Sequence, residues 1–410
     1  MRGALILEDG RRFGGELHGS ASGAVPVSDD APGIGEVVFQ TGMTGYQEVI
    51  TDPSYRGQIV TFTSTHIGNT GVNRFDEEAA APALAGVVVR SLSGRPSSWR
   101  SHETLPGYLD RHGIPCLSEV DTRALTRHIR ERGALRGVIV ADGVPVSAAT
   151  ERARAFPGLT GRDLVREVIP ESSDDDFRAS PFLVPFEESG FASRDEYEFA
   201  RTAEELAESF PARRDTRLSL GGSRVTVVHT GMKEGIDACL RRRGALVRVV
   251  RPDVSAKELL WGDPDGVLLS NGPGDPDSQE QLIATVREVL GRAPLMGICL
   301  GFQVLALALG GRTRKMKHGH HGLNHPVKDL ESGRVLVTSQ NHGFEVVRSS
   351  LPEGVIPTYL SLNDDTLEGF RYPAQAVRAV QFHPEARGGP HDAAYLLYSP
   401  FAEDSCHAPV

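Results

Sequence analysis

The stretch that decides the fold of the second half of this chain is Gly297-Ile298-Cys299-Leu300-Gly301. A lone cysteine lies between two glycines, after an apolar run and before a helix-like one. This is the thiol counterpart of the G-x-S-x-G elbow, in which a tight strand-to-helix turn presents a nucleophile above a sheet edge. Small flanking residues allow the sharp turn, and the following helix N-terminus offers N–H groups to an oxyanion. The pattern therefore predicts that Cys299 is a nucleophile rather than a packed structural thiol.

A second motif near the C-terminus, Gln381-Phe382-His383-Pro384-Glu385, supplies the other groups that such a nucleophile needs. Residues two apart in an extended chain face the same side, so Glu385 is expected to reach the His383 ring. The carboxylate would fix the tautomer of the imidazole and leave its other nitrogen for the thiol. Cys299, His383 and Glu385 together form a set suited to acyl transfer through a thioester. The alternative is that His-Pro-Glu is only a surface turn.

The second half of the chain alternates between strand-like and helix-like segments. This rhythm predicts a mostly parallel sheet covered by helices, with ligands at the carboxyl ends of the strands. The Cys299 turn and the glycine-containing loop 271–276 both fall at that edge, and neither is a phosphate-binding loop. The expected strands are 224–229, 245–250, 266–270 and 294–298. The expected helices are 233–243, 279–290 and one that begins at Ser255. Two later strands, 334–338 and 376–382, are expected to pair antiparallel.

The first half of the chain reads as a strand-rich α/β domain. Glycine and proline clusters separate short β-like runs. One helix is clear, because Asp121 can cap it, Leu125 and Ile129 share a face, and Gly133 can end it. The expected strands are 35–39, 58–63, 85–90 and 137–141.

The segment Glu171–Phe199 is acidic, with nine Asp or Glu against two Arg. We interpret it as an exposed linker or peripheral excursion rather than an acidic docking site. The predicted organisation is an N-terminal domain over residues 1–170, this linker over 171–221, and a second domain over 222–410.

Composition excludes several classes of protein. A net charge of −10 argues against a nucleic-acid binder. Four widely spaced cysteines form no C-x-x-C pair and indicate free thiols in a reducing compartment. No stretch resembles a signal peptide or a membrane span, so a cytoplasmic location without membrane attachment is expected.

The histidine-rich run His318-Gly319-His320-His321-Gly322-Leu323-Asn324-His325 invites a metal interpretation. No cysteine or carboxylate accompanies it at ligand spacing, and cysteine–histidine chemistry needs no metal. We therefore expect a loop or partner-facing segment here, and no metal site.

Four motifs together resemble the class I (triad) glutamine amidotransferases. They are Ser270–Pro276, Gly297–Gln303, Ser339-Gln340-Asn341-His342-Gly343-Phe344 and Phe382–Glu385. Further motifs resemble one family among them, the small glutamine-hydrolysing subunits of carbamoyl-phosphate synthetase, over roughly Leu5–Leu397. These are Thr44-Gly45-Tyr46-Gln47-Glu48, Thr51-Asp52-Pro53-Ser54-Tyr55, His66-Ile67-Gly68-Asn69, Asp121-Thr122-Arg123 and His320–Lys328.

The resemblance implies a role for each matching residue. Cys299 would be the nucleophile, His383 the base and acid, and Glu385 the group that orients it. Backbone N–H groups of Gly272 and Leu300 would stabilise the oxyanion. The remaining residues expected to hold L-glutamine are Gly42, Gly274, Gln303, Asn341, Gly343 and Phe344.

The resemblance also implies a partner. Ammonia would pass through a channel to a large subunit that binds ATP, Mg²⁺ and bicarbonate and makes carbamoyl phosphate for arginine and pyrimidine synthesis. The small chain would hold no cofactor itself, and its N-terminal domain would be a docking surface in a heterodimer or larger assembly.

Two positions depart from the family pattern. Gly42 stands where many relatives have serine, so a side-chain contact to glutamine is lost or replaced by backbone. His229-Thr230-Gly231 stands where relatives usually read Asp-Phe-Gly, which puts the packing at that strand end in doubt. Competing hypotheses are the glutaminase parts of GMP, anthranilate or CTP synthesis, another cysteine–histidine hydrolase, and a catalytically silent scaffold subunit.

Overall fold

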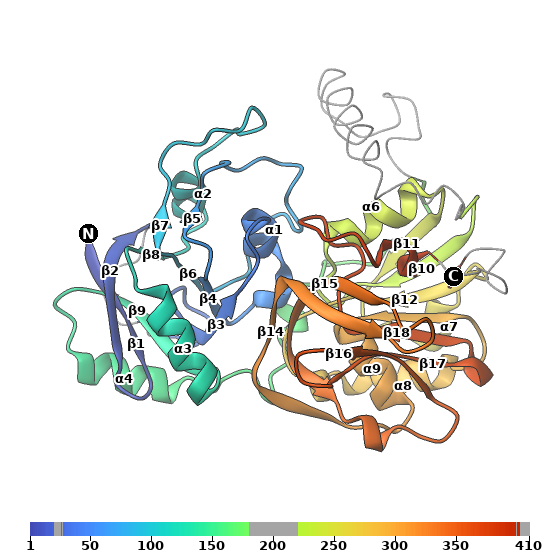
Figure 1. Ribbon diagram of the computed structural model, residues 1–410. Helices are drawn as coiled ribbons and strands as arrows, with labels where there is room; N and C mark the ends of the chain where they lie inside the picture. The colour runs from blue at the N-terminus through green and yellow to red at the C-terminus, as the bar shows by residue number, and fades with distance from the viewer. Residues whose placement is uncertain (20–25, 27, 180–219, 399, 402–410) are drawn as a thin grey trace.

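The computed structural model describes residues 1–19, 26, 28–179, 220–398 and 400–401. An N-terminal part and a C-terminal part lie side by side, with β14 and α3 near their boundary (Figure 1). Residues 180–219 of the predicted linker over 171–221 lie outside the described residues. Residues 173–178 run along strand β11 (Leu246–Val250), where Arg178 forms an antiparallel bridge to Val247. Among the described helices, none is long and apolar enough to cross a membrane.

The N-terminal part is built around a closed barrel, which the sequence analysis does not anticipate. Its strands pair partly antiparallel and partly parallel. Around the barrel they are β1 (Arg2–Leu7), β2 (Arg12–His18), β8 (Cys116–Ser118), β6 (Gly86–Val88), β4 (Gln58–Phe62), β3 (Ile34–Gln40) and β9 (Leu135–Ala141); a separate two-stranded sheet joins β5 (His66–Ile67) and β7 (Ser91–Leu92).

Four helices cover the barrel, and each buries one apolar face. Leu125 and Ile129 of α3 pack among the barrel residues, while Phe156 follows α4 and packs on Ile6 and Val138. The predicted start and end of α3 are confirmed, since Asp121 accepts from the Ala124 N–H and Gly133 ends the helix. The helices are α1 (Tyr46–Thr51), α2 (Leu105–Arg111), α3 (Thr122–Arg132) and α4 (Val146–Ala155).

The C-terminal part contains one nine-stranded sheet. The first five strands in its order pair in parallel, as predicted, and the remaining strands pair antiparallel. In spatial order they are β11 (Leu246–Val250), β10 (Arg224–Val228), β12 (Gly266–Leu269), β13 (Leu295–Ile298), β18 (Val377–Val380), β17 (Leu367–Tyr372), β16 (Ile356–Ser361), β14 (Thr313–Asp329) and β15 (Val335–Val346).

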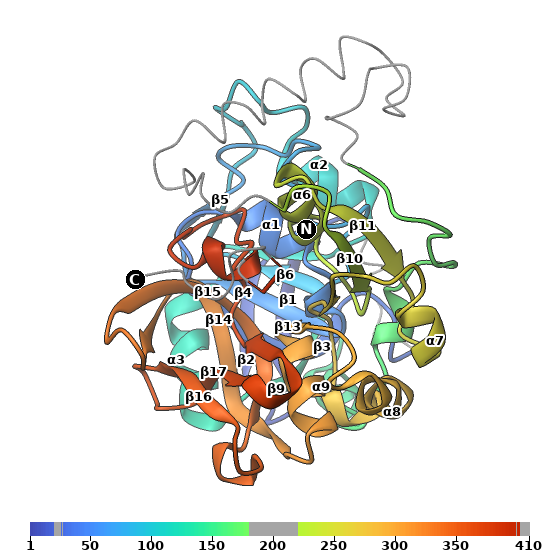
Figure 2. The ribbon, with the colours of Figure 1, turned by 90° about the vertical axis from the view of Figure 1, so that its right-hand side faces the viewer.

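Helices cover both faces of this sheet (Figure 2). Val228 faces the core formed with α8 and α9, whereas Val225 and Val227 face Ile236 and Leu240 of α6. This alternation along a strand buried on both faces is what a parallel sheet between two helical layers requires. The helices are α6 (Glu234–Arg242), α7 (Ala256–Leu259), α8 (Glu280–Val289) and α9 (Leu300–Ala308).

Short 3₁₀ turns occur in both parts of the chain. They are η1 (Pro53–Tyr55), η2 (Val165–Glu167), η5 (Pro276–Ser278), η6 (Arg348–Ser350), η7 (Pro373–Gln375) and η8 (Ala394–Leu397).

The predicted strands and helices of the second half are confirmed to within two residues, except that β15 continues to Val346 instead of ending at residue 338. Strands β14, β16 and β17 are not among the predicted elements, and one segment is predicted wrongly. Residues 318–325 do not form a loop; they lie within the long strand β14, and His320 and His321 are buried. Glycine and histidine obscure the alternation that marks a strand, and the burial depends on distant partners that local sequence does not reveal.

Candidate functional site

The predicted nucleophile turn is present between β13 and α9. Cys299 caps α9 with φ 54° and ψ −103°, an unusual conformation for a non-glycine residue. Its N–H donates to the Val380 carbonyl at 2.9 Å, which ties the turn to the neighbouring strand. A Cβ at Gly301 would lie 2.2 Å from the Leu269 carbonyl oxygen, and one at Gly297 would lie 2.6 Å from the Gly301 backbone. Both glycines are therefore needed to hold the thiol in this position.

His383 and Glu385 come together as predicted. His383 Nδ1 and Glu385 Oε1 are 2.7 Å apart, and both side chains are buried. His383 Nε2 has no hydrogen-bond partner in the described part of the chain, so it is available to the nucleophile. The thiol of Cys299 donates to the Asn341 carbonyl at 3.5 Å.

The charges around His383 favour its protonated form. Burial opposes an imidazolium, but the Glu385 carboxylate and the nearby Cys299 sulfur outweigh burial and raise the pKa of His383 to about 10. For Glu385, burial again opposes the charge, but Lys233 and His383 lower the pKa of its carboxyl to about 2. The site therefore holds an ionised carboxylate beside a ring that readily carries a proton.

A buried lysine, to which no sequence pattern points, completes this array. Lys233 Nζ lies 3.1 Å from Glu385 Oε1 and 3.5 Å from Glu78 Oε1. Burial lowers the pKa of this ammonium, but Glu385 and Glu78 more than compensate and raise it. Glu78 comes from the N-terminal part, and its carboxylate also accepts from the Gly235 N–H at 2.9 Å. No local pattern links these residues, because they are 152 and 155 positions from Lys233 in sequence.

The departure at His229-Thr230-Gly231 leaves the strand end well packed. His229 Nδ1 accepts from the Gly231 and Met232 N–H groups at 3.2 and 3.4 Å. Burial lowers the pKa of His229 to about 4, so its ring is a neutral acceptor near pH 7. Thr230 Oγ1 donates to the neighbouring strand end around Ser270. The hydrogen bonds to the His229 ring therefore stabilise the turn that leads to Lys233.

A cavity opens beside Cys299, and most of the residues expected to hold glutamine line it. The predicted residues that line it are Gly272, Gly274, Cys299, Gln303, Asn341, Gly343 and Phe344. The predicted residues that do not line it are Gly42, Leu300, His383 and Glu385. The Gly42 N–H instead donates to Gln40 Oε1 at 2.7 Å.

The loop bearing Gly272 lies against the nucleophile turn. A Cβ at Gly272 would lie 2.8 Å from Leu300 Cδ2 and 2.0 Å from the Thr230 carbonyl oxygen, so only glycine fits. Leu300 is the first residue of α9, where its N–H has no acceptor within the helix. Gln303 Nε2 donates to the Phe344 carbonyl and to Gln381 Oε1, both at 2.9 Å, which fixes this side chain beside the cavity.

The N-terminal part contributes directly to the cavity wall. Asn341 Nδ2 donates to Asp52 Oδ2 at 2.8 Å, and Asn341 Oδ1 pairs with His321 Nδ1 at 2.9 Å. Asn271 Nδ2 donates to Ser54 Oγ at 2.9 Å. The segment Asp52–Tyr55 thus orients Asn271 in the loop after β12 and Asn341 on strand β15. The sequence motif around Asp52 was noted, but its role in positioning Asn341 was not predicted.

Comparisons with known proteins identify the family of this chain. The carbamoyl-phosphate synthase small chain, CPSase domain, matches residues 5–139, and the class-I glutamine amidotransferase family matches residues 226–399. One similar protein is the carbamoyl phosphate synthase small chain of Thioalkalivibrio sulfidiphilus, which is 45% identical over 96% of this chain and 94% of that one. Another is the carbamoyl phosphate synthase small chain of Escherichia coli K12, which is 43% identical over 96% of this chain and 94% of that one. That of Rhodopirellula baltica is 42% identical over 97% and 95%. The chain therefore belongs to the carbamoyl phosphate synthase small-chain family and carries the glutamine-hydrolysing domain of that synthase.

Proposed function

We propose that this chain hydrolyses L-glutamine through a thioester on Cys299 and passes the ammonia to a large ATP-using subunit. The observation that carries the proposal is the buried array of Cys299, His383, Glu385 and Lys233 behind a cavity lined by Gly272, Asn341 and Gly343. No other group of described residues joins a strained cysteine turn to a histidine–carboxylate pair.

In the first step, His383 Nε2 takes the thiol proton of Cys299, and the resulting thiolate attacks the carboxamide carbon of glutamine. The charge that develops on oxygen is stabilised by the Gly272 and Leu300 N–H groups, each oxyanion donor being worth roughly 10²–10³ in rate. His383 protonates the departing ammonia, and Glu385 keeps the ring oriented while Lys233 holds the carboxylate. Such general acid–base assistance contributes on the order of 10²–10⁴.

In the second step, His383 removes a proton from water, which attacks the thioester carbon and releases glutamate. When the tetrahedral intermediate collapses, the C–S bond breaks and His383 returns its proton to the Cys299 sulfur, which restores the thiol. Gln303, Asn341, Gly343, Phe344 and Gly274 are assigned to holding the glutamine backbone and carboxamide. Gly42 is left with a backbone role, because its side chain offers no contact.

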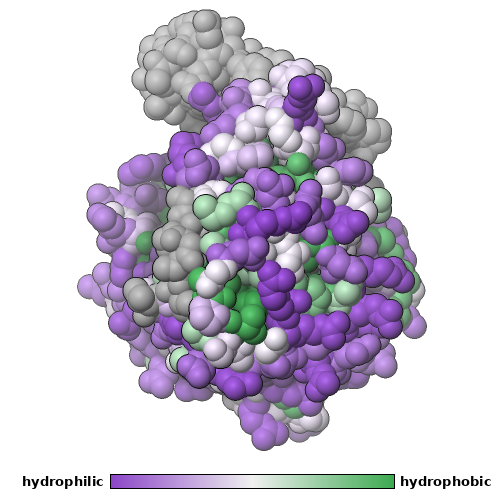
Figure 3. All heavy atoms as spheres, turned by 90° about the vertical axis from the view of Figure 1, so that its left-hand side faces the viewer, coloured by the Kyte–Doolittle hydropathy of each residue, from purple (hydrophilic) through white to green (hydrophobic). Residues whose placement is uncertain are grey.

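The remaining assignments concern what lies outside this chain. The chain itself is expected to need no cofactor for glutamine hydrolysis, while ATP, Mg²⁺ and bicarbonate would bind the large subunit. The N-terminal part is assigned to docking that subunit. The face shown in Figure 3 is mainly hydrophilic, with a hydrophobic patch near its middle. Free Cys116, Cys239 and Cys299 support a reducing, cytoplasmic location.

The substitution Cys299→Ser tests this division of labour. In a complex reconstituted with the large subunit, glutamine-dependent carbamoyl phosphate synthesis should be lost while ammonia-dependent synthesis persists. If added ammonia failed to restore synthesis, the assignment of chemistry to two subunits would be wrong. A glutaminase rate independent of the partner would instead favour a freestanding cysteine–histidine hydrolase, and a wild-type chain without glutaminase activity would favour a silent scaffold.

A further inference from the structure

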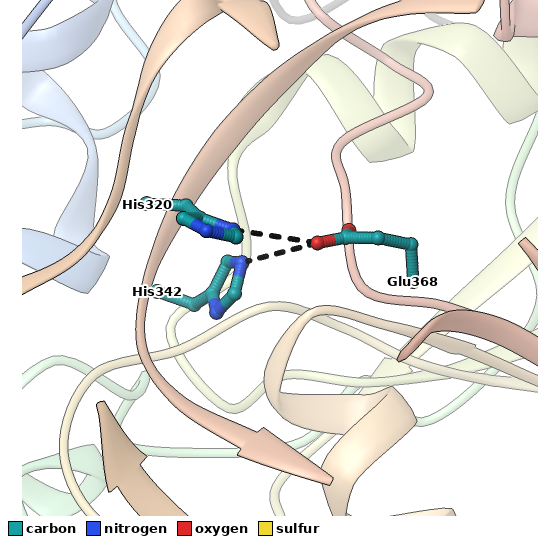
Figure 4. Close-up of side chains that lie close together, drawn as sticks. All are labelled: His320, His342 and Glu368. Carbon is teal, nitrogen blue, oxygen red and sulfur yellow. Dashed lines mark ion pairs between the residues drawn. The ribbon is translucent and has the colours of Figure 1, made fainter. Parts of the chain in front are cut away.

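Two imidazole rings and a carboxylate meet in the C-terminal sheet, apart from the catalytic triad. His320 on β14 and His342 on β15 are directly paired across the two antiparallel strands, and Glu368 lies on β17. Both rings face the same oxygen, Glu368 Oε1, at 3.4 Å from His320 Nδ1 and 3.9 Å from His342 Nε2 (Figure 4). All three residues are buried.

The outer nitrogens of both rings are already engaged. His320 Nε2 is 2.9 Å from Asp364 Oδ2, and His342 Nδ1 is 2.8 Å from the Phe344 carbonyl oxygen. A carbonyl oxygen only accepts, so His342 Nδ1 carries the proton and Nε2 presents a lone pair. This arrangement, in which the outer nitrogen donates to oxygen and the inner nitrogen is left bare, is the one that metal-bound histidines adopt.

The two inner ring nitrogens lack hydrogen-bond partners in the described part of the chain, whereas Glu368 Oε1 accepts from Thr366 Oγ1 at 3.5 Å. Within the described part of the chain, neither His320 Nδ1 nor His342 Nε2 makes a hydrogen bond. The lone pair of His342 faces a carboxylate oxygen, and two acceptors cannot satisfy each other. Gln340 Nε2 donates to the other oxygen, Glu368 Oε2, at 2.8 Å, which holds the carboxylate with Oε1 toward the rings. A cation between the three atoms would accept the lone pairs of both nitrogens and offset the buried charge of the carboxylate.

The spacing fits a small transition-metal ion. All three atoms lie within 4.8 Å of one another. Ligands at 2.0–2.2 Å from a tetrahedral zinc ion lie roughly 3.3–3.5 Å apart. The two nitrogen–oxygen distances, 3.4 and 3.9 Å, are close to this value, and two ligand atoms as much as 4.8 Å apart would have to approach by roughly 1.3–1.5 Å to close the site. Imidazole nitrogens with one carboxylate are a ligand set that zinc uses, with a fourth position left for water. We propose that His320, His342 and Glu368 bind one divalent transition-metal ion, with zinc the best match.

This proposal revises the expectation, made from sequence, that the histidine-rich run holds no metal. The missing carboxylate comes from Glu368, more than 40 positions after His320. An ion here would clamp β14 and β15 to β17 beside Asn341 and Gly343, which line the cavity. Its role would be to fix these strands, and no step of glutamine hydrolysis passes through it.

Metal analysis of the full chain tests the site. The purified protein is stripped with EDTA, exchanged into metal-free buffer, incubated with excess zinc sulfate, dialysed and analysed by mass spectrometry for bound zinc. We expect about one zinc per wild-type chain and at least tenfold less in Glu368→Gln and in His320→Asn. Matched controls are Glu331→Gln, whose side chain is half exposed, and His18→Asn in the N-terminal barrel. Both should retain wild-type zinc.

Each outcome decides the proposal. Wild-type protein that holds less than a tenth of an equivalent would overturn it, as would folded Glu368→Gln and His320→Asn that keep their zinc. A protonated His320 shared between Glu368 and Asp364 would then be the correct account. If the variants fail to fold, anomalous scattering at the zinc edge from zinc-treated wild-type crystals decides: a peak between the three side chains supports the site, and its absence refutes it.

Discussion

Replacing Glu385 with glutamine isolates the contribution of the charge that orients His383. Glutamine keeps the size of the side chain and can still accept from His383 Nδ1, but it removes the negative charge 2.7 Å away. Lys233 keeps Glu78 at 3.5 Å as a partner, so the buried ammonium is not left unpaired. The fold should therefore survive the substitution, and its effect should fall on the imidazole.

The size of the effect follows from the bond that is weakened. A hydrogen bond between charged groups contributes about 1.5–3 kcal/mol. If that amount is lost from the transition state, in which His383 carries a proton, kcat/KM for glutamine hydrolysis falls roughly 10- to 150-fold. The pH dependence of stability should change as well. In the wild type the raised pKa of His383 stabilises the fold fully below about pH 6.5, and this contribution is lost as the pH rises toward about 10. In Glu385→Gln this loss should be smaller.

The assay is glutamate release by the chain reconstituted with its large subunit, together with urea unfolding between pH 6 and 10. Glu8→Gln is the matched control, because Glu8 pairs with Arg136 at 2.7 Å in the N-terminal part, away from the cavity. The control should retain wild-type kcat/KM. A Glu385→Gln enzyme within twofold of wild type, with the same decline of stability above pH 6.5, would refute the role given to this carboxylate.

Two further substitutions probe the surroundings of the triad. Lys233→Met leaves Glu385 and Glu78 as buried carboxylates without their cation. The free energy of unfolding, measured by urea titration, should therefore fall by about 3–5 kcal/mol. A loss below about 1 kcal/mol would contradict the stabilising role of the buried ion pairs. Gly343→Ala adds a methyl group that meets no atom within 4 Å in the protein, so stability should change by no more than about 0.5 kcal/mol. The same methyl group enters the cavity, so the KM for glutamine should rise roughly 10-fold or more, and an unchanged KM would show that glutamine binds elsewhere.

The sequence reveals the parts of this protein that depend on local pattern. The glycines around Cys299 predict its turn because a Cβ at either position would collide with backbone. The two-residue spacing of His383 and Glu385 likewise predicts their contact. These short-range constraints are sufficient to locate the Cys299 turn and the His383–Glu385 pair, whereas the predicted glutamine-binding residues that line the cavity follow from the family resemblance.

Long-range pairings are what the sequence could not reveal. The barrel depends on β1 closing against β9, more than 130 residues away, and neither strand signals its partner. The contacts of Lys233 with Glu78 and of Asn341 with Asp52 join the two halves of the chain. Residues 318–325 were misjudged for the same reason, because their burial depends on His342 and Glu368 rather than on neighbours in sequence.

Labelling with an electrophilic glutamine analogue, in which a reactive ketone replaces the carboxamide, tests the central claim most directly. The described cysteines provide an internal comparison, because burial raises the pKa of Cys116 to about 12 and Cys239 lies on α6, away from the cavity lining. Peptide mass spectrometry should find one label per chain, on Cys299, with glutaminase activity lost in proportion and protection by L-glutamine. Inactivation with the label on another residue, or full activity after Cys299 is labelled, would contradict the account.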